Sequence, residues 1–76
     1  MNDFIVNFAE VFDETPIEEF TPGTIFKDLG EWSSLHGLAT INMVELKYDV
    51  KLNAADILQA NTIQDLFELM SKKKMV

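Results

Sequence analysis

The chain has 76 residues, of which 47% are hydrophobic and 25% charged, and its formal net charge is −7 at pH 7. This length indicates one small globular domain, residues 1–76, with little room for a deep, water-excluding active site. The acidic balance argues against binding to nucleic acid or anionic lipid, both of which need basic surface. It indicates either protein partners with basic docking patches or a surface charge that serves solubility alone.

The first predicted element is a helix from about Asn2 or Asp3 to Phe12. Asn2 and Asp3 are good N-cap residues, and apolar residues recur behind them at helical spacing. These apolar residues are Ile5, Phe8, Ala9 and Phe12. We expect this helix to contribute to the core and to carry no chemistry.

A long connection follows, from Asp13 to Ser33. Thr15-Pro16 and Thr21-Pro22-Gly23 are turn signals, and a residue before proline is biased away from helix. A connection of this length must be pinned to the core or serve a function. We expect a short helical turn over residues 16–20. The predicted apolar pins are Ile17, Phe20, Ile25, Phe26 and Leu29.

The second predicted helix runs from Ser34 to Tyr48 or Asp49. Its expected apolar stripe consists of Leu35, Leu38, Ile41 or Asn42, Met43, Val44 and Leu46. Gly37 lies in its first turns, where glycine costs about 1 kcal/mol relative to alanine. Gly37 is therefore either a bare patch that lets a bulky group approach Ser34 or a tolerated weak position.

A short third helix is predicted over Ala54–Gln59, capped by Asn53 and anchored by Ile57 and Leu58. Thr62 and Asp65 resemble a capping box at the start of a fourth helix. The apolar residues of that helix are Ile63, Leu66, Phe67 and Met70, and Lys72, Lys73 and Lys74 at its end complement the helix dipole. No segment alternates with period two, so we predict an all-α fold: a small four-helix bundle with three longer helices, one short helix and a long first connection.

Several kinds of chemistry are not supported by the sequence. There is no cysteine, which excludes a disulfide framework, a thiolate metal site and a cysteine nucleophile. The one histidine, His36, lies two positions from Ser34, and such neighbours on a helix do not face each other. We expect it to be a surface or cap-adjacent residue. Asp49, Asn53 and Asp56 lack the spacing of a calcium loop. We therefore expect no catalytic residue, no metal site and no enzyme activity.

The remaining expectations concern location. The start, Met1-Asn2-Asp3-Phe4, lacks the basic region and apolar core of a signal peptide. No apolar run approaches the length needed to span a bilayer. We expect a cytoplasmic monomer that does not insert into membranes.

Two adjacent serines, Ser33 and Ser34, open the second helix. A helix start presents unpaired N–H groups and a partial positive charge, so a phosphate ester is favourable there. We interpret Ser34 as an attachment point that the rest of the chain presents.

The run Phe26-Lys27-Asp28-Leu29-Gly30, followed by Ser34-Leu35 at a helix start, resembles the acyl carrier protein family. That family typically has Leu-Gly, one or two residues, and then Asp-Ser-Leu, whose serine bears 4′-phosphopantetheine. The likeness continues through Glu45–Leu52 and Asn61–Leu66 and covers essentially the whole chain. It implies an acyl-carrier-like fold whose Ser34 receives the arm from coenzyme A through a phosphopantetheinyl transferase.

The chain departs from the family pattern at several positions. Ser33 stands where the family has aspartate; because Leu35 follows Ser34, the motif selects Ser34 and leaves Ser33 as the helix cap. Trp32 adds a residue before the serine and serves either as an anchor for the connection or as a shield for the arm. After Ser34 the exposed face offers His36, Ala39 and Asn42 instead of acidic residues, which favours a dedicated pathway with its own partners.

The function implied by the resemblance is that of an acyl carrier. Acyl intermediates would be held as thioesters on the arm in a fatty acid, polyketide or specialised lipid pathway, and tethering would raise their effective concentration at acyl-processing enzymes. Leu38, Ile41, Met43 and Leu46 line either an acyl groove or the ordinary core. An aminoacyl or peptidyl carrier remains an alternative. So does an unmodified helical interaction module, because the aspartate is missing.

Overall fold

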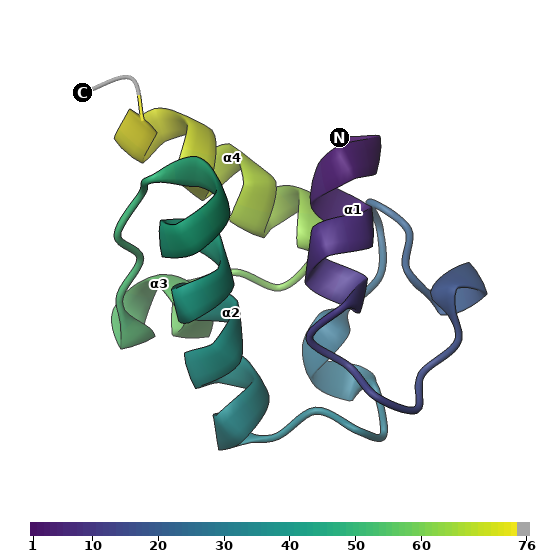
Figure 1. Ribbon diagram of the computed structural model, residues 1–76. Helices are drawn as coiled ribbons and strands as arrows, with labels where there is room; N and C mark the ends of the chain where they lie inside the picture. The colour runs from purple at the N-terminus through teal and green to yellow at the C-terminus, as the bar shows by residue number, and fades with distance from the viewer. Residues whose placement is uncertain (75–76) are drawn as a thin grey trace.

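A computed structural model describes residues 1–74 and shows three longer helices and one short helix around a shared apolar core (Figure 1). The helices are α1 (Asn2–Ala9), α2 (Ser34–Tyr48), α3 (Ala54–Gln59) and α4 (Ile63–Lys74). Two 3₁₀ turns, Ile17–Glu19 and Phe26–Asp28, interrupt the connection between α1 and α2. The predicted all-α fold with a long first connection is confirmed. None of the helices in residues 1–74 has the length and apolar character needed to cross a membrane.

Aromatic rings from α1 and the following connection form the centre of the core. Phe8 is fully buried, and its ring centroid lies 5.3 Å from Phe12, 6.1 Å from Phe20 and 5.6 Å from Phe26. Edge-on ring pairs at such distances add to the free energy gained by burying their apolar area. Because these rings come from both segments, they hold the connection against α1.

The start and end of α1 differ from the prediction. The N-cap position is Met1 and no side chain caps it, so the predicted capping by Asn2 and Asp3 is wrong. The helix ends at Ala9, three residues before the predicted Phe12. Phe12 is nevertheless buried, because the chain turns there and directs its ring onto Phe8. Burial in the core does not require the residue to remain helical.

The long connection is pinned by two aromatic residues and by its backbone. Phe20 and Phe26 are buried as predicted, whereas Ile17 and Ile25 are about half exposed, so their predicted role as apolar pins is wrong. Near Ile25 the connection is held by backbone hydrogen bonds instead of by an apolar side chain. Ile25 forms an antiparallel bridge with Thr62, and the Ile63 N–H donates to the Thr24 carbonyl at 3.1 Å. Main-chain groups therefore tie the connection to the start of α4, and this tie does not depend on burial of the Ile25 side chain.

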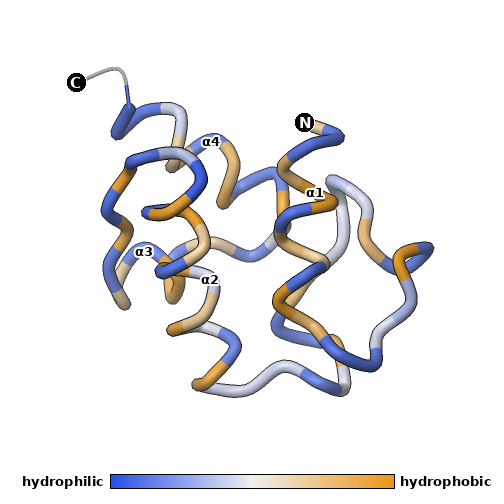
Figure 2. Tube along the Cα trace, in the orientation of Figure 1, coloured by the Kyte–Doolittle hydropathy of each residue, from blue (hydrophilic) through white to orange (hydrophobic). Residues whose placement is uncertain are grey.

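The buried face of α2 also differs from the predicted stripe. Its buried residues are Gly37, Thr40, Met43 and Val44, while Leu35, Leu38 and Leu46 are 75%, 64% and 76% exposed. Figure 2 shows apolar and polar residues alternating in short runs along α2. Met43 and Val44 are buried as predicted, but the predicted burial of the three leucines is wrong. Gly37 and Thr40 occupy the rest of the face that touches the core, where their small size allows close approach. The three leucines are left on the surface.

The two capping boxes of the C-terminal half are present. Asn53 and Asp56 exchange backbone-to-side-chain hydrogen bonds of 2.9 Å at the start of α3, and Thr62 and Asp65 do so at 3.1 Å before α4. Ile57 is buried as predicted, but Leu58 is 74% exposed, so its predicted anchoring role is wrong. The buried residues of α4 are Ile63, Leu66 and Met70. Lys73 adds an unpredicted tie by donating to the Asp56 carboxylate.

Candidate functional site

Ser34 is the first residue of α2 and is exposed to solvent. The preceding residue, Ser33, has extended backbone, and its carbonyl accepts the first helical hydrogen bonds from His36 N–H at 3.0 Å and Gly37 N–H at 3.2 Å. The Ser34 hydroxyl thus stands where a 15-residue helix presents unpaired N–H groups and its positive dipole end. A group with negative charge is favourable at this position.

The two adjacent serines have different hydrogen bonding. Ser33 occupies the N-cap position through its backbone, but its side chain makes no cap hydrogen bond. Its hydroxyl lies 2.8 Å from Nδ1 of His36 instead, so the predicted cap role is correct for the backbone and wrong for the side chain. Among residues 1–74 no hydrogen bond engages the Ser34 hydroxyl. The Ser33 hydroxyl is therefore held by a hydrogen bond within the fold, whereas the Ser34 hydroxyl is free.

His36 connects Ser33 to Glu31. Its Nε2 lies 3.4 Å from Oε2 of Glu31, and its ring centroid is 4.9 Å from that of Phe12. The side chain is only 18% exposed, so this cap-adjacent histidine packs more closely than a surface residue. One neutral tautomer fits both contacts: Ser33 O–H donates to Nδ1, and Nε2–H donates to the carboxylate. His36 therefore positions Ser33, and its hydrogen bonds do not include Ser34.

Glu31 ties the beginning of the long connection to the segment that precedes α2. Its carboxylate accepts hydrogen bonds from the backbone N–H of Asp13 at 2.7 Å, of Glu14 at 3.0 Å and of Thr15 at 3.0 Å. The Thr15 hydroxyl donates a further bond at 2.8 Å. Hydrogen bonds to an ionised group are stronger than those between neutral groups. We call these four bonds from residues 13–15 to the Glu31 carboxylate the Glu31 clamp.

The clamp changes the acidity of Glu31. Desolvation raises the pKa of the carboxyl, but the hydrogen bonds from Thr15, Asp13, Glu14 and His36 outweigh it and lower the pKa from 4.5 to about 2. The role of Glu31 was not predicted from the sequence. Its clamp partners lie 16 to 18 positions away, and no local pattern marks such a contact.

An apolar pocket of about 560 Å³ opens beside Ser34, between α2, α3 and the segment before α2. Gly37 forms part of its wall: a methyl group added there would lie 3.7 Å from Cζ2 of Trp32 and 3.9 Å from Cγ2 of Ile57. These are ordinary contact distances, so the packing of Trp32 does not require glycine, and Gly37 fits the alternative of a tolerated weak position. The pocket is lined by Lys27, Trp32, Ser33, Ser34, Gly37, Leu38, Ile41, Ala54, Ile57 and Leu58.

The predicted groove residues divide between two hollows. Leu38 and Ile41 line the pocket beside Ser34. Met43 and Leu46 instead line a hollow of about 240 Å³ between α1 and α2, so they do not belong to an acyl groove beside Ser34. They project from a different side of α2, because residues five positions apart on a helix lie on different faces. For Met43 the alternative of ordinary core packing is correct, because its side chain is buried in the core.

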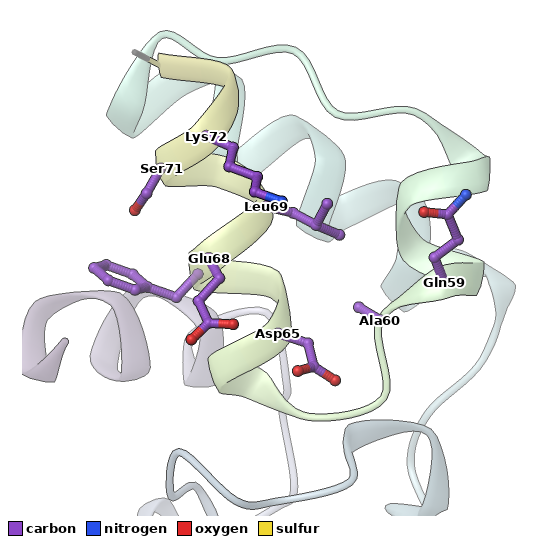
Figure 3. Close-up of a pocket in the computed structure, with 8 residues that line it drawn as sticks. Gln59, Ala60, Asp65, Glu68, Leu69, Ser71 and Lys72 are labelled. Carbon is purple, nitrogen blue, oxygen red and sulfur yellow. The ribbon is translucent and has the colours of Figure 1, made fainter.

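A further hollow of about 690 Å³ follows α4 and the end of α3 (Figure 3). Neither Ser33 nor Ser34 lines it, and its Asp65 already accepts the capping hydrogen bonds of α4. Glu68, Ser71 and Lys72 give it a polar rim. The pocket that adjoins Ser34 is the one placed to receive a group attached there.

Residues 4–70 match the family described as "Phosphopantetheine attachment site". No curated protein and no solved structure matches the chain. Members of this family carry covalently attached 4′-phosphopantetheine, are not catalysts themselves, and work with a phosphopantetheinyl transferase and with enzymes that process their cargo. Because the match spans nearly the whole four-helix fold, the chain belongs to the phosphopantetheine-attachment family of carrier domains.

Proposed function

We propose that Ser34 bears the 4′-phosphopantetheine arm and that the protein is an acyl carrier. The observation that carries this proposal is the free, exposed Ser34 hydroxyl at the N-terminus of α2, next to an apolar pocket. Ser33, the other candidate, has its hydroxyl bonded to His36. The pathway would be fatty acid, polyketide or specialised lipid synthesis.

The residues around Ser34 suit a phosphodiester. In the transfer, the Ser34 oxygen forms a bond to the phosphorus of the phosphopantetheine, the pyrophosphate bond of coenzyme A breaks, and the adenosine bisphosphate leaves while the hydroxyl proton is lost. The product carries one negative charge, and the N-terminus of α2 stabilises an anion at this place. Once attached, the arm supplies the thiol that this chain lacks, since it contains no cysteine.

The pocket supports acyl cargo over aminoacyl cargo. Its walls are mostly apolar, so an acyl chain gains free energy by leaving water there, at roughly 25 cal/mol for each Å² buried. An unpaired ammonium would lose its hydration in the same place. Its volume of about 560 Å³ lies within the range of small-molecule sites.

The surface of α2 supports dedicated partner enzymes. The exposed residues that follow Ser34 are apolar or neutral: Leu35, Leu38, Ala39 and Asn42. Acidic side chains return only at Glu45 and Asp49. We infer that acyl-processing partners contact the first turns of α2 through apolar groups and use basic docking patches for the acidic remainder of the protein.

Intact-mass measurement tests the attachment site. Purified protein is incubated with coenzyme A and a broad-specificity transferase, alongside Ser34→Ala and Ser33→Ala. We expect the wild type and Ser33→Ala to gain the mass of the arm and Ser34→Ala to gain nothing. A gain that survives Ser34→Ala but is lost in Ser33→Ala would move the site to Ser33. No gain with several transferases would favour an unmodified interaction module.

A further inference from the structure

Lys27 is the one charged side chain that lines the pocket beside Ser34 within residues 1–74. Its Nζ donates to the Leu58 carbonyl at 2.7 Å and lies 5.6 Å from the ring centroid of Phe26. No carboxylate of residues 1–74 lines this pocket, and the other lining groups are apolar apart from Ser33 and Ser34. The ammonium is thus fixed at an apolar pocket without an acidic partner there.

This charge is opposite to that of the protein as a whole. The chain has 13 acidic and 6 basic residues, so its long-range field attracts cations. Inside the pocket the nearest charge is positive, and apolar walls strengthen the interaction of that charge with its neighbours relative to water. A carboxylate that reaches the pocket meets a favourable partner, whereas an ammonium meets a like charge.

We propose that Lys27 selects the cargo: the pocket accepts an acyl group that ends in a carboxylate and disfavours a cargo that ends in an ammonium. This inference rests on the proposed attachment of the arm to Ser34. Because the arm tethers the cargo beside the pocket, even a weak ion pair would operate at high effective concentration. The cargo carboxylate would join the Leu58 carbonyl as a second acceptor of the three Lys27 N–H donors.

The test compares cargoes that differ only at the far end. A transferase loads the protein from heptanoyl-, heptanedioyl- and ω-aminohexanoyl-coenzyme A, and intact mass follows cleavage of each thioester by neutral hydroxylamine. Dividing the rate constant for the free acyl-pantetheine by that for the loaded protein gives a protection factor for each cargo. The variants are Lys27→Gln, Lys27→Arg and Lys27→Glu. Lys51→Gln is the matched control, because Lys51 is exposed and lines none of the pockets described above.

The measured quantity is the ratio of protection factors, heptanedioyl over aminohexanoyl. We expect a ratio above one in the wild type and in Lys27→Arg, a fall on the order of two- to five-fold in Lys27→Gln, and a ratio below one in Lys27→Glu. An unchanged ratio in Lys27→Gln, or an equal fall in Lys51→Gln, would overturn the role of Lys27. Failure to load folded wild-type protein would instead overturn the Ser34 assignment, and this proposal with it.

Discussion

The Ser33 hydroxyl lies 2.8 Å from Nδ1 of His36, so the side chain beside Ser34, the proposed attachment residue, is held within the fold. The resemblance to acyl carrier proteins implies an aspartate at the position where this chain has Ser33. Here the nearest carboxylate on the same chain of hydrogen bonds is Glu31, which His36 contacts at 3.4 Å. Glu31 therefore supplies a negative charge in the segment before α2, and its carboxylate holds the start of the long connection through the N–H groups of residues 13–15.

Replacing His36 by alanine removes both hydrogen bonds and the ring contact with Phe12. We expect His36→Ala to lower the free energy of unfolding by about 1–3 kcal/mol, measured by urea denaturation. Ser33→Ala removes one hydrogen bond and should cost less, about 0.5–1.5 kcal/mol. Equal stability of His36→Ala and the wild type would show that the His36 contacts do not hold this segment.

Glu31 should make stability depend on pH in acid. Its folded pKa of about 2 lies below the ordinary value of 4.5, so the ionised form stabilises the fold above pH 4.5, and this contribution is lost as the pH falls towards 2. In Glu31→Gln we expect lower stability at neutral pH and a flatter decline between pH 4.5 and 2. Urea midpoints measured across this range check the slope. Glu18→Gln, at an exposed position of the same connection, is the control, and its urea midpoint should fall with pH as steeply as that of the wild type.

Gly37→Ala should stabilise the unmodified protein. The added methyl group would meet Trp32 and Ile57 at ordinary contact distances of 3.7 and 3.9 Å, and alanine is the better helix former. We expect a gain of about 0.5–1 kcal/mol in the free energy of unfolding. Gly37→Leu, which fills the pocket wall, is the contrasting variant and should reduce the protection of a loaded acyl thioester. Destabilisation by the alanine variant would contradict the packing of Trp32 against α2.

Asp49 offers a stabilising substitution at the end of α2. It has the one positive φ among residues 1–74, 57°, in the left-handed region that favours glycine. Asp49→Gly should raise the free energy of unfolding by about 0.5–1 kcal/mol, as measured by urea or thermal denaturation. Asp49→Ala keeps the steric cost of a Cβ and should give no gain. If both variants changed the free energy of unfolding equally, the left-handed backbone conformation at Asp49 would not be the cause of the change.

The sequence allowed those parts of the fold to be predicted that depend on neighbouring residues. The bounds of α2 and α3, the cap at Asn53 and the capping box of Thr62 and Asp65 rest on contacts within a few positions, and all were predicted correctly. The part of Asp56 in the cap at Asn53 was not predicted. The buried face of α2 was predicted only at Met43 and Val44, because Gly37 and Thr40 break the apolar period that marks a buried stripe.

The site shows the same division between near and distant contacts. The position of Ser34 at a helix start is a local feature, and it was predicted correctly from the sequence. The clamp of Glu31 on Asp13, Glu14 and Thr15 joins segments separated by 16 to 18 positions, and its donors are mostly backbone groups. Any residue type has those groups, so no residue pattern could reveal the clamp. The pocket beside Ser34 could not be predicted either, because its walls come from both α2 and α3 and the sequence does not show how these helices pack together.

Trp32 has a practical consequence, because it is the only tryptophan in the chain. Its indole packs edge-on against Phe26 at 4.9 Å and forms part of the pocket wall. Tyr48, the one tyrosine, accepts a hydrogen bond from Asn7 at a separate place between α1 and α2. Fluorescence excited at the red edge of the indole band therefore comes from a single site. The protein carries its own optical reporter, with which filling of the pocket can be followed in real time without any label.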